Sequence, residues 1–257
     1  MLLCLSPSKD MNFDEPERAV RGTQPRLLDD TDALAQVMKG KSAKDLKDLM
    51  GISDKLAELN VERYKKFQEQ GTSNSAKQAA LAFTGDVYRH FDAETLTLEE
   101  LDTAQSCVRI LSGLYGVLRP LDMIQPYRLE MGIKLATDRG ESIYDFWGNK
   151  ITNLLNEDME GWGDRLLLNL SSNEYFSAVN TDTLKGDVLD VKFLNEKDGK
   201  AKVIGLFAKR ARGAMARWIV QNNIDNRKDL SDFDWEGYSF ERKLTTATEL
   251  VFKRKQP

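Results

Sequence analysis

Cysteine and histidine are scarce in this sequence of 257 residues, which has two cysteines and one histidine. Cys4 and Cys107 lie far apart, so they make no disulfide framework, and we expect both to be buried thiols. His90 stands alone and no Cys-x-x-Cys pair occurs, so the ligands of a structural zinc or an iron–sulfur cluster are missing. Carboxylates remain possible ligands for magnesium or iron, but no spacing demands them. We expect no metal site and no cofactor.

Long apolar runs are absent as well. The longest runs, such as those at 166–168 and 203–207, are only a few residues long and fall far short of the roughly 20 residues that span a bilayer. The first residues are apolar, but no basic region precedes them and no small-residue cleavage site follows, which argues against a signal peptide. We therefore expect a cytoplasmic protein that does not associate with membranes.

The net charge of −4 excludes a chain covered in basic residues, but the charges are unevenly distributed. Residues 199–224 contain six basic side chains and no acidic one, whereas residues 91–102 contain five acidic side chains and no basic one. This pattern predicts a polarised molecule with one cationic face.

Hydrophobic periodicity predicts a mixed α/β (α+β) fold. The first part is helix-rich after a buried strand at 1–5, with helical spacing from Leu27 to about Gln70 and further helices expected at 77–83, 98–114 and 144–159. The second part is strand-rich. There we expect a strand at 165–170, a helix after the capping box Ser171-x-x-Glu174, a hairpin of 187–195 with 200–208, a helix at 210–222, and strands at 238–240 and 249–253.

No linker or internal repeat separates the two parts, so we expect one compact domain over residues 1–257. The N-terminal strand and the C-terminal strands then belong to one mixed sheet.

Residues 49–57, Leu-Met-Gly-Ile-Ser-Asp-Lys-Leu-Ala, have the layout of a helix-hairpin-helix, which we expect over about 44–66. Backbone N–H groups at the start of its second helix suit DNA phosphates. A serine stands where a second glycine is common, and an ordinary turn between two helices is the alternative interpretation. The candidate DNA-binding residues here are Lys47, Gly51, Ile52, Ser53 and Lys55.

A second basic candidate is the run from Lys209 through Arg210 and Arg212 to Gly213, at an expected strand-to-helix transition. Guanidinium groups suit phosphates, and Gly213 has no side chain to block a ligand. A solvated helix face is the alternative.

Two loops carry further polar candidates. Lys9 follows the first strand, where it suits a phosphate or carboxylate, and Tyr127, Arg128 and Glu130 follow the turn at Pro126. A buried structural ion pair is the alternative for the second loop. Nothing near His90 in the sequence gives it a partner, so we expect it at the surface without a function.

Several of these segments together resemble the YaaA peroxide-stress family of bacteria, and the resemblance covers nearly the whole chain. The segments are Leu5 to Lys9, Ile52 to Ala57, Phe83 to Tyr88, Leu111 to Asp122, Pro126 to Gly132, Phe146 to Gly148, Asn169 to Tyr175, Lys209 to Gly213 and Glu249 to Arg254. The run that ends at Asp122 is the most specific. The third residue of the first loop, Ser8, stands where an alanine is common in the family, and Lys9 is unchanged.

The resemblance implies a cytosolic protein that limits peroxide damage by keeping intracellular free iron low. It also implies a single-domain α/β fold, a helix-hairpin-helix and a positively charged cleft that binds double-stranded DNA. Lys9, Arg128 and the 209–212 run then become walls of one cleft.

Two hypotheses follow. The first is a DNA-binding stress protein that holds double-stranded DNA independently of sequence. The second is an enzyme acting on a nucleobase or nucleotide, such as a glycosidase or base-modifying enzyme. In that case Lys9 or Glu130 is the nucleophile or acid/base, Tyr127 donates a hydrogen bond, and Arg128 and Lys209 hold a phosphate. Direct iron storage ranks below both, because His and Cys clusters are missing.

Overall fold

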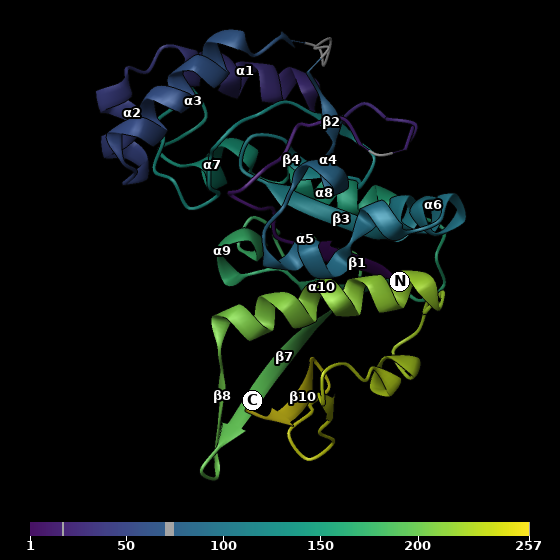
Figure 1. The fold of residues 1–257 in the computed structure, drawn as a ribbon. Helices are drawn as coiled ribbons and strands as arrows, with labels where there is room; N and C mark the ends of the chain where they lie inside the picture. The colour runs from purple at the N-terminus through teal and green to yellow at the C-terminus, as the bar shows by residue number, and fades with distance from the viewer. Residues whose placement is uncertain (17, 70–74, 257) are drawn as a thin grey trace.

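A mixed β-sheet runs through the centre of the fold, with helices packed around it (Figure 1). The structure, a computed structural model, describes residues 1–16, 18–69 and 75–256. Eight strands of these residues form the sheet, in the order β4-β3-β1-β6-β7-β10-β9 with β8 paired to β7. They are β1 (Leu2–Leu5), β3 (Val108–Ser112), β4 (Gly116–Leu118), β6 (Leu166–Leu170), β7 (Asp187–Lys197), β8 (Lys200–Val203), β9 (Ser239–Phe240) and β10 (Glu249–Lys255). A two-stranded sheet pairs β2 (Lys77–Gln78) with β5 (Met123–Ile124).

Five neighbouring strands, β3, β1, β6, β7 and β10, run parallel, and the strands added at their edges are antiparallel. β1 lies between β3 and β6, and all four of its residues are buried. A parallel strand covered on both faces is apolar throughout, which is why the N-terminal segment contains no alternation. The expected mixed sheet of N-terminal and C-terminal strands is confirmed.

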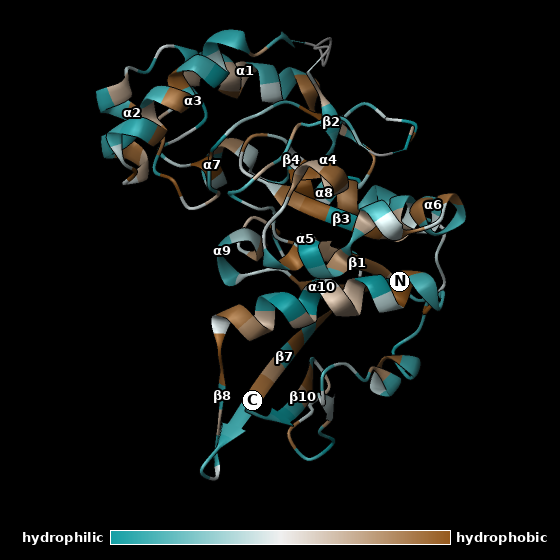
Figure 2. Ribbon diagram, viewed as in Figure 1, coloured by the Kyte–Doolittle hydropathy of each residue, from teal (hydrophilic) through white to brown (hydrophobic). Residues whose placement is uncertain are grey.

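The helices surround this sheet (Figure 1). They are α1 (Leu28–Lys39), α2 (Ala43–Met50), α3 (Asp54–Lys66), α4 (Ala79–Ala82), α5 (Asp86–Phe91), α6 (Leu98–Cys107), α7 (Ile143–Trp147), α8 (Lys150–Asp158), α9 (Asn173–Phe176) and α10 (Gly205–Gln221), with 3-10 turns η2 (Ala93–Thr95) and η3 (Asp229–Asp232). Gln70, where the first helical segment was expected to end, lies outside the described residues. The apolar colour concentrates on β1, β3 and β7, whereas α2 and α3 are largely hydrophilic (Figure 2).

Three helix predictions are wrong in part. The helix expected over 98–114 ends at Cys107, and the next five residues form β3, a fully buried strand. Periodicity does not separate a short buried strand from a buried helix, which explains the error. The helix expected over 144–159 is two helices, because Gly148 interrupts it with a φ of +46°. In the segment expected as helix over 77–83, residues 77–78 form β2 and only Ala79–Ala82 are helical.

Two predictions for the strand-rich second part of the chain are also corrected. The hairpin around Asp198 and Gly199 is confirmed, but β8 ends at Val203 and α10 begins at Gly205, so the 209–212 run lies within a helix. The capping box at Ser171 is wrong. Ser172 is the N-cap residue of α9, and its side chain makes no capping hydrogen bond.

α10 crosses closely over α5 (Figure 1), and Gly213 of α10 lies at the contact. A Cβ on Gly213 would lie 1.9 Å from the carbonyl oxygen of Val87. Gly213 is therefore a packing residue, and the expectation that it leaves room for a ligand is wrong.

Two helices joined by a short turn occupy the region expected as the helix-hairpin-helix. α2 ends at Gly51, whose φ of +60° gives a left-handed cap, and α3 begins after Ser53. The Ser53 hydroxyl accepts a hydrogen bond from the Leu56 amide, so one N–H at the start of α3 already has a partner. The identity of this pair as a DNA-binding motif stays a prediction.

Candidate functional site

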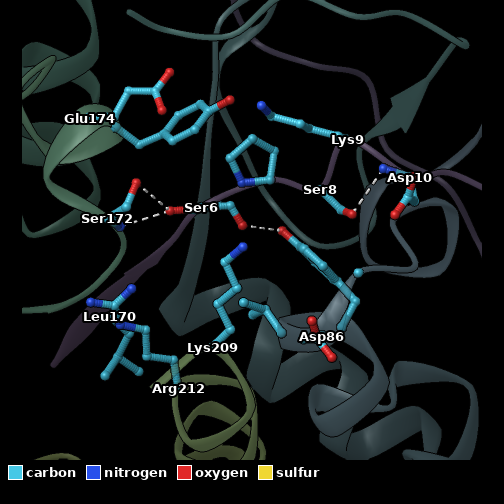
Figure 3. Close-up of a pocket in the computed structure, with 15 residues that line it drawn as sticks. Ser6, Ser8, Lys9, Asp10, Asp86, Leu170, Ser172, Glu174, Lys209 and Arg212 are labelled. Carbon is cyan, nitrogen blue, oxygen red and sulfur yellow. Dashed lines mark hydrogen bonds between the residues drawn. The ribbon is translucent and has the colours of Figure 1, made fainter. Parts of the chain in front are cut away.

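A cleft opens at the carboxyl ends of β1 and β6. β1 has β3 on one side and β6 on the other, so the chain adds strands to opposite sides of β1. Open α/β sheets form ligand crevices at such a point, outside the carboxyl ends of the strands. The cleft has a volume of about 380 Å³ and is lined by four chain segments (Figure 3). These are residues 6–10 after β1, residues 85–88 at the start of α5, four residues of 170–175 after β6, and Lys209 with Arg212 on α10.

Ser6 joins two of these segments. The Ser172 amide donates to the Ser6 hydroxyl oxygen at 2.8 Å, and the Ser6 hydroxyl donates to Ser172 Oγ at 3.3 Å. The Tyr88 hydroxyl donates to the Ser6 carbonyl oxygen at 2.8 Å. Hydrogen bonds across 166 and 82 residues of sequence therefore fix the centre of the cleft.

α5 and α10 form the lower wall in the close-up view (Figure 3). Lys209 rises from α10 toward Ser6, and Arg212 lies beside it below Ser172. Gly85 brings the start of α5 against the first loop, where a Cβ on this glycine would lie 2.4 Å from Ser8 Oγ. The side chain of Lys209 is exposed, whereas Arg212 is half-buried. Burial lowers the pKa of Arg212, a shift that nearby Asp190 opposes, and its buried Nε has no hydrogen-bond partner.

A second lobe of the cleft shares Lys9 and Tyr175 with the first and contains the 127–130 loop. Glu130 is 7% exposed. Its Oε1 atom lies 3.0 Å from Lys9 Nζ and 3.0 Å from Arg128 Nη2. Its buried Oε2 atom has no hydrogen-bond partner. The structure thus brings Lys9, Arg128 and Glu130 together, and the ion pair considered for this loop is present.

The tyrosines of the cleft are neutral. Burial raises the pKa of Tyr127 well above its usual range, and its hydroxyl lies 2.7 Å from the Ser112 hydroxyl. Burial likewise raises the pKa of Tyr175 and of Tyr88. A buried phenol that stays protonated serves as a hydrogen-bonding group or an apolar wall.

The formal charges of the cleft balance. Its two lobes are lined by four basic side chains, Lys9, Arg128, Lys209 and Arg212, and by four acidic ones, Asp10, Asp86, Glu130 and Glu174. The cleft is therefore not uniformly cationic. Positive charge is concentrated along α10, and Arg210, which does not line the cleft, lies 3.6 Å from Asp86 Oδ1.

The α2–α3 turn does not join this cleft. Lys47, Ile52, Ser53 and Lys55 line neither lobe. Tyr64, near the other end of α3, donates to the Arg128 carbonyl oxygen at 2.8 Å, and the eleven residues from Ser53 to Tyr64 span about 16 Å of helix. The turn also has its own ion pair, between Lys47 Nζ and Asp54 Oδ1 at 2.8 Å.

Sequence reasoning missed Ser6, Tyr88, Ser172 and Tyr175 as site residues. The available signal was their position, because Ser6 and Ser172 lie within two residues of the ends of buried strands whose carboxyl ends meet at one edge of the sheet.

The expectations for the cysteines and the histidine are partly right. Cys4 is buried, Cys107 only partly. His90 is half-buried, with Nδ1 2.8 Å from the Asp86 carbonyl oxygen and its ring against Trp235, which corrects its expected surface position.

Two kinds of feature are absent from residues 1–16, 18–69 and 75–256. No group of three or more His, Cys, Asp or Glu side chains within them is arranged to hold a metal ion. In the same part of the chain, no helix combines the length and apolar character needed to cross a bilayer.

The fold and the cleft define a mixed α/β protein whose polar crevice lies at the carboxyl ends of parallel strands. Residues 1–244 match the family described as peroxide stress protein YaaA. The chain belongs to this family, which confirms the resemblance seen in its motifs and supports a role in the peroxide stress response.

Proposed function

We propose that this peroxide-stress protein binds double-stranded DNA independently of sequence, and thereby protects DNA and helps to keep intracellular free iron low. The α2–α3 turn holds the DNA backbone at one point, and the basic residues of the cleft hold it at another. The effect on iron is indirect in this proposal.

One observation carries the proposal. Lys9, Lys209 and Arg212 come from chain segments about 200 residues apart and converge on a single cleft. β8, which precedes α10 in the chain, adds Lys200 and Lys202, which are both exposed. Lysine and arginine contacts to phosphates position a protein on DNA without reading its sequence, so the binding is sequence-tolerant.

Salt dependence tests this proposal. If about four phosphates are contacted, the log-log slope of affinity against salt is about −3.6. We would titrate a labelled duplex by fluorescence anisotropy at several salt concentrations. A flat salt response, or no binding at low salt, contradicts the proposal.

Matched variants locate the two contacts. Gly51→Glu adds an acidic group at the turn, and Gly51→Ala imposes the same left-handed backbone strain without the charge. For the cleft, Lys209→Gln is compared with Lys185→Gln, which removes an exposed lysine just before β7, at the opposite end of the parallel strands. We expect Gly51→Glu and Lys209→Gln to weaken binding and to reduce the salt slope, and the two controls to resemble the wild type.

A second candidate is an enzyme acting on a nucleobase or nucleotide. The cleft volume lies within the range of small-molecule pockets, roughly 300–1,000 Å³, and neutral tyrosines and carboxylates lie beside its basic residues. Phosphate binding alone does not need those groups. Lys9 and Glu130 are the candidates for nucleophile or acid/base, with Tyr127 as a hydrogen-bonding residue.

Product formation tests the second candidate. Damaged DNA and free nucleotides would be incubated with the wild type and with Lys9→Ala, and products separated by chromatography. Turnover that Lys9→Ala abolishes supports the enzyme. Unchanged turnover in this variant removes Lys9 as a catalyst.

A further inference from the structure

Two cations that line the cavity of about 380 Å³ have no partner among the described residues. Lys209 and Arg212 lie three positions apart on α10, a spacing that places both side chains on one face of the helix. Neither takes part in an ion pair or a side-chain hydrogen bond there, whereas Lys9 and Arg210 each form an ion pair. A half-buried guanidinium group gains free energy when an anion reaches it, so this end of the cavity favours an anionic group.

α10 holds these two cations in a fixed position. Gly213 follows directly and packs against α5, where an added Cβ would lie 1.9 Å from the Val87 carbonyl oxygen. Arg217, one turn further along α10, donates to the Asp92 carbonyl oxygen at the end of α5 at 2.7 Å. The two basic side chains therefore start from a rigid helix, and little free energy is lost in ordering their backbone when a ligand binds.

The far side of the same cavity carries hydrogen-bond acceptors. Asp10 and Glu174 line it, and both are exposed. Figure 3 shows Glu174 across the cavity from Lys209 and Arg212. One oxygen of Glu174 accepts the Gly132 amide at 3.1 Å, which holds the side chain in place. Carboxylates repel a second anionic group but accept hydrogen bonds from hydroxyl groups, so the cavity favours a ligand with one anionic end and one hydroxylated end.

The cavity has room for more than the anionic group. Its volume lies within the range of small-molecule pockets, roughly 300–1,000 Å³, and a phosphate group alone fills only a small part of it. A phosphate monoester carries a charge of about −1.5 to −2 at neutral pH, which matches two neighbouring cations. A diester of the DNA backbone carries a single charge.

We infer that this cavity binds the phosphate monoester of a sugar, with the phosphate on Lys209 and Arg212 and the sugar hydroxyls donating to Asp10 or Glu174. A free sugar phosphate and a nucleoside monophosphate share this chemistry. The inference deepens the second candidate function, on which it rests for its site, by naming the class of ligand. It requires neither turnover nor binding of duplex DNA.

Calorimetric titration at one salt concentration tests the inference with two pairs of probes, ribose 5-phosphate with ribose and adenosine 5′-monophosphate with adenosine. We expect each phosphate to bind at least about tenfold more tightly than its unphosphorylated partner, because hydrogen bonds to charged groups contribute about that factor. Inorganic phosphate should bind at least about tenfold more weakly than ribose 5-phosphate. Tighter binding of adenosine 5′-monophosphate than of ribose 5-phosphate supports a nucleotide as the ligand, and equal binding supports a sugar phosphate.

Matched variants locate the phosphate. Lys209→Gln and Arg212→Gln each remove one cation from the cavity, and we expect each to weaken both phosphorylated probes about tenfold. Lys185→Gln and Arg242→Gln remove exposed side chains of the same types that do not line the cavity, and they should bind like the wild type. Circular dichroism checks that each variant is folded. The wild-type comparison needs no variant, so it stands even if Arg212→Gln does not fold.

The outcomes separate this inference from the proposed functions. Equal wild-type affinity for phosphorylated and unphosphorylated probes, or no binding of any of them, overturns the inference. Equal affinity for inorganic phosphate and ribose 5-phosphate overturns the role of the sugar. Affinities unchanged in both Lys209→Gln and Arg212→Gln overturn the placement of the phosphate on α10. If the phosphorylated probes bind and no product forms, the inference stands and the enzyme does not, and duplex titration decides DNA binding independently.

Discussion

The α2–α3 turn and the contact between α5 and α10, which form one wall of the cleft, depend on two very different glycines. Gly51 has open space around it, with nothing within 4 Å of an added Cβ, and its requirement is a positive φ. Gly213 lies within a regular helix, and its requirement is the nearby backbone of α5. The turn is therefore specified by the conformation of a few consecutive residues, whereas the cleft depends on how closely distant elements approach one another.

The largest expected effect is at Gly213. Gly213→Ala places a Cβ 1.9 Å from the Val87 carbonyl oxygen, so α10 must move away from α5. We expect a loss of about 3 kcal/mol in the free energy of unfolding, measured by urea denaturation. Gly40→Ala is the control, since Gly40 has a φ of −74° and its nearest neighbour is 3.5 Å away, and it should stabilise by about 0.5 kcal/mol. Equal effects of the two substitutions would refute the comparison.

The next effect concerns ion pairs near the strands of the cleft. Asp158 lies 2.6 Å from Arg109 and 2.7 Å from Arg26, and all three side chains are largely buried. Asp158→Asn leaves two buried guanidinium groups without their counter-charge. We expect a cost of about 2–3 kcal/mol in the free energy of unfolding, determined by the same urea titration, because Arg26 keeps some exposure to solvent.

The same group predicts a pH dependence. Burial opposes ionisation of Asp158, but hydrogen bonds from Arg109 and Arg26 outweigh it and hold the pKa of the carboxyl group below its usual 3.8. The stabilisation is therefore complete above pH 3.8 and is lost as the pH falls through the lower folded pKa. Thermal unfolding between pH 6 and pH 2 should show this loss in the wild type. If Asp158→Asn follows the same acid profile, Asp158 is not its source.

A smaller effect is expected at the turn. Gly51→Ala keeps free space but forces a φ of +60° on a residue with a Cβ, which costs about 1 kcal/mol. Urea denaturation measures the cost. Hydrogen exchange should show faster opening confined to α2 and the start of α3. Faster exchange throughout α10 would show that the turn and the cleft are coupled.

The smallest effect is at the exposed ion pair of the turn. Asp54→Asn removes the partner of Lys47, and both side chains are largely exposed. We expect a change below about 1 kcal/mol in thermal or urea unfolding, because solvent screens such pairs. A loss as large as that of Asp158→Asn would show that the turn is more tightly integrated than its exposure indicates.

Much of the fold was predictable because its signals are local. The buried strand at residues 2–5, the hairpin at Asp198 and Gly199, and the helices around Gly51 depend on neighbours in sequence. The errors occurred where a local pattern fits two structures. Val108–Ser112 is apolar enough for either a helix or a strand, and its pairing with β1 decides the outcome.

The candidate site divides in the same way. Lys9, Arg128, Glu130 and Lys209 were recognised as polar residues next to turns or in a basic run, and the structure places them around one cleft. The hydroxyl network of Ser6, with partners 82 and 166 residues away, has no sequence signal of its own.

The sequence by itself determined the family, the parallel strand at the N-terminus and the types of residue available for binding, because these depend on composition and on short motifs. The tertiary structure alone decided that acidic side chains balance the basic ones in the cleft, that Gly213 is a packing residue, and that Glu130 keeps one oxygen without a partner. These properties arise from contacts between segments far apart in the chain, and a linear pattern does not record distances in space.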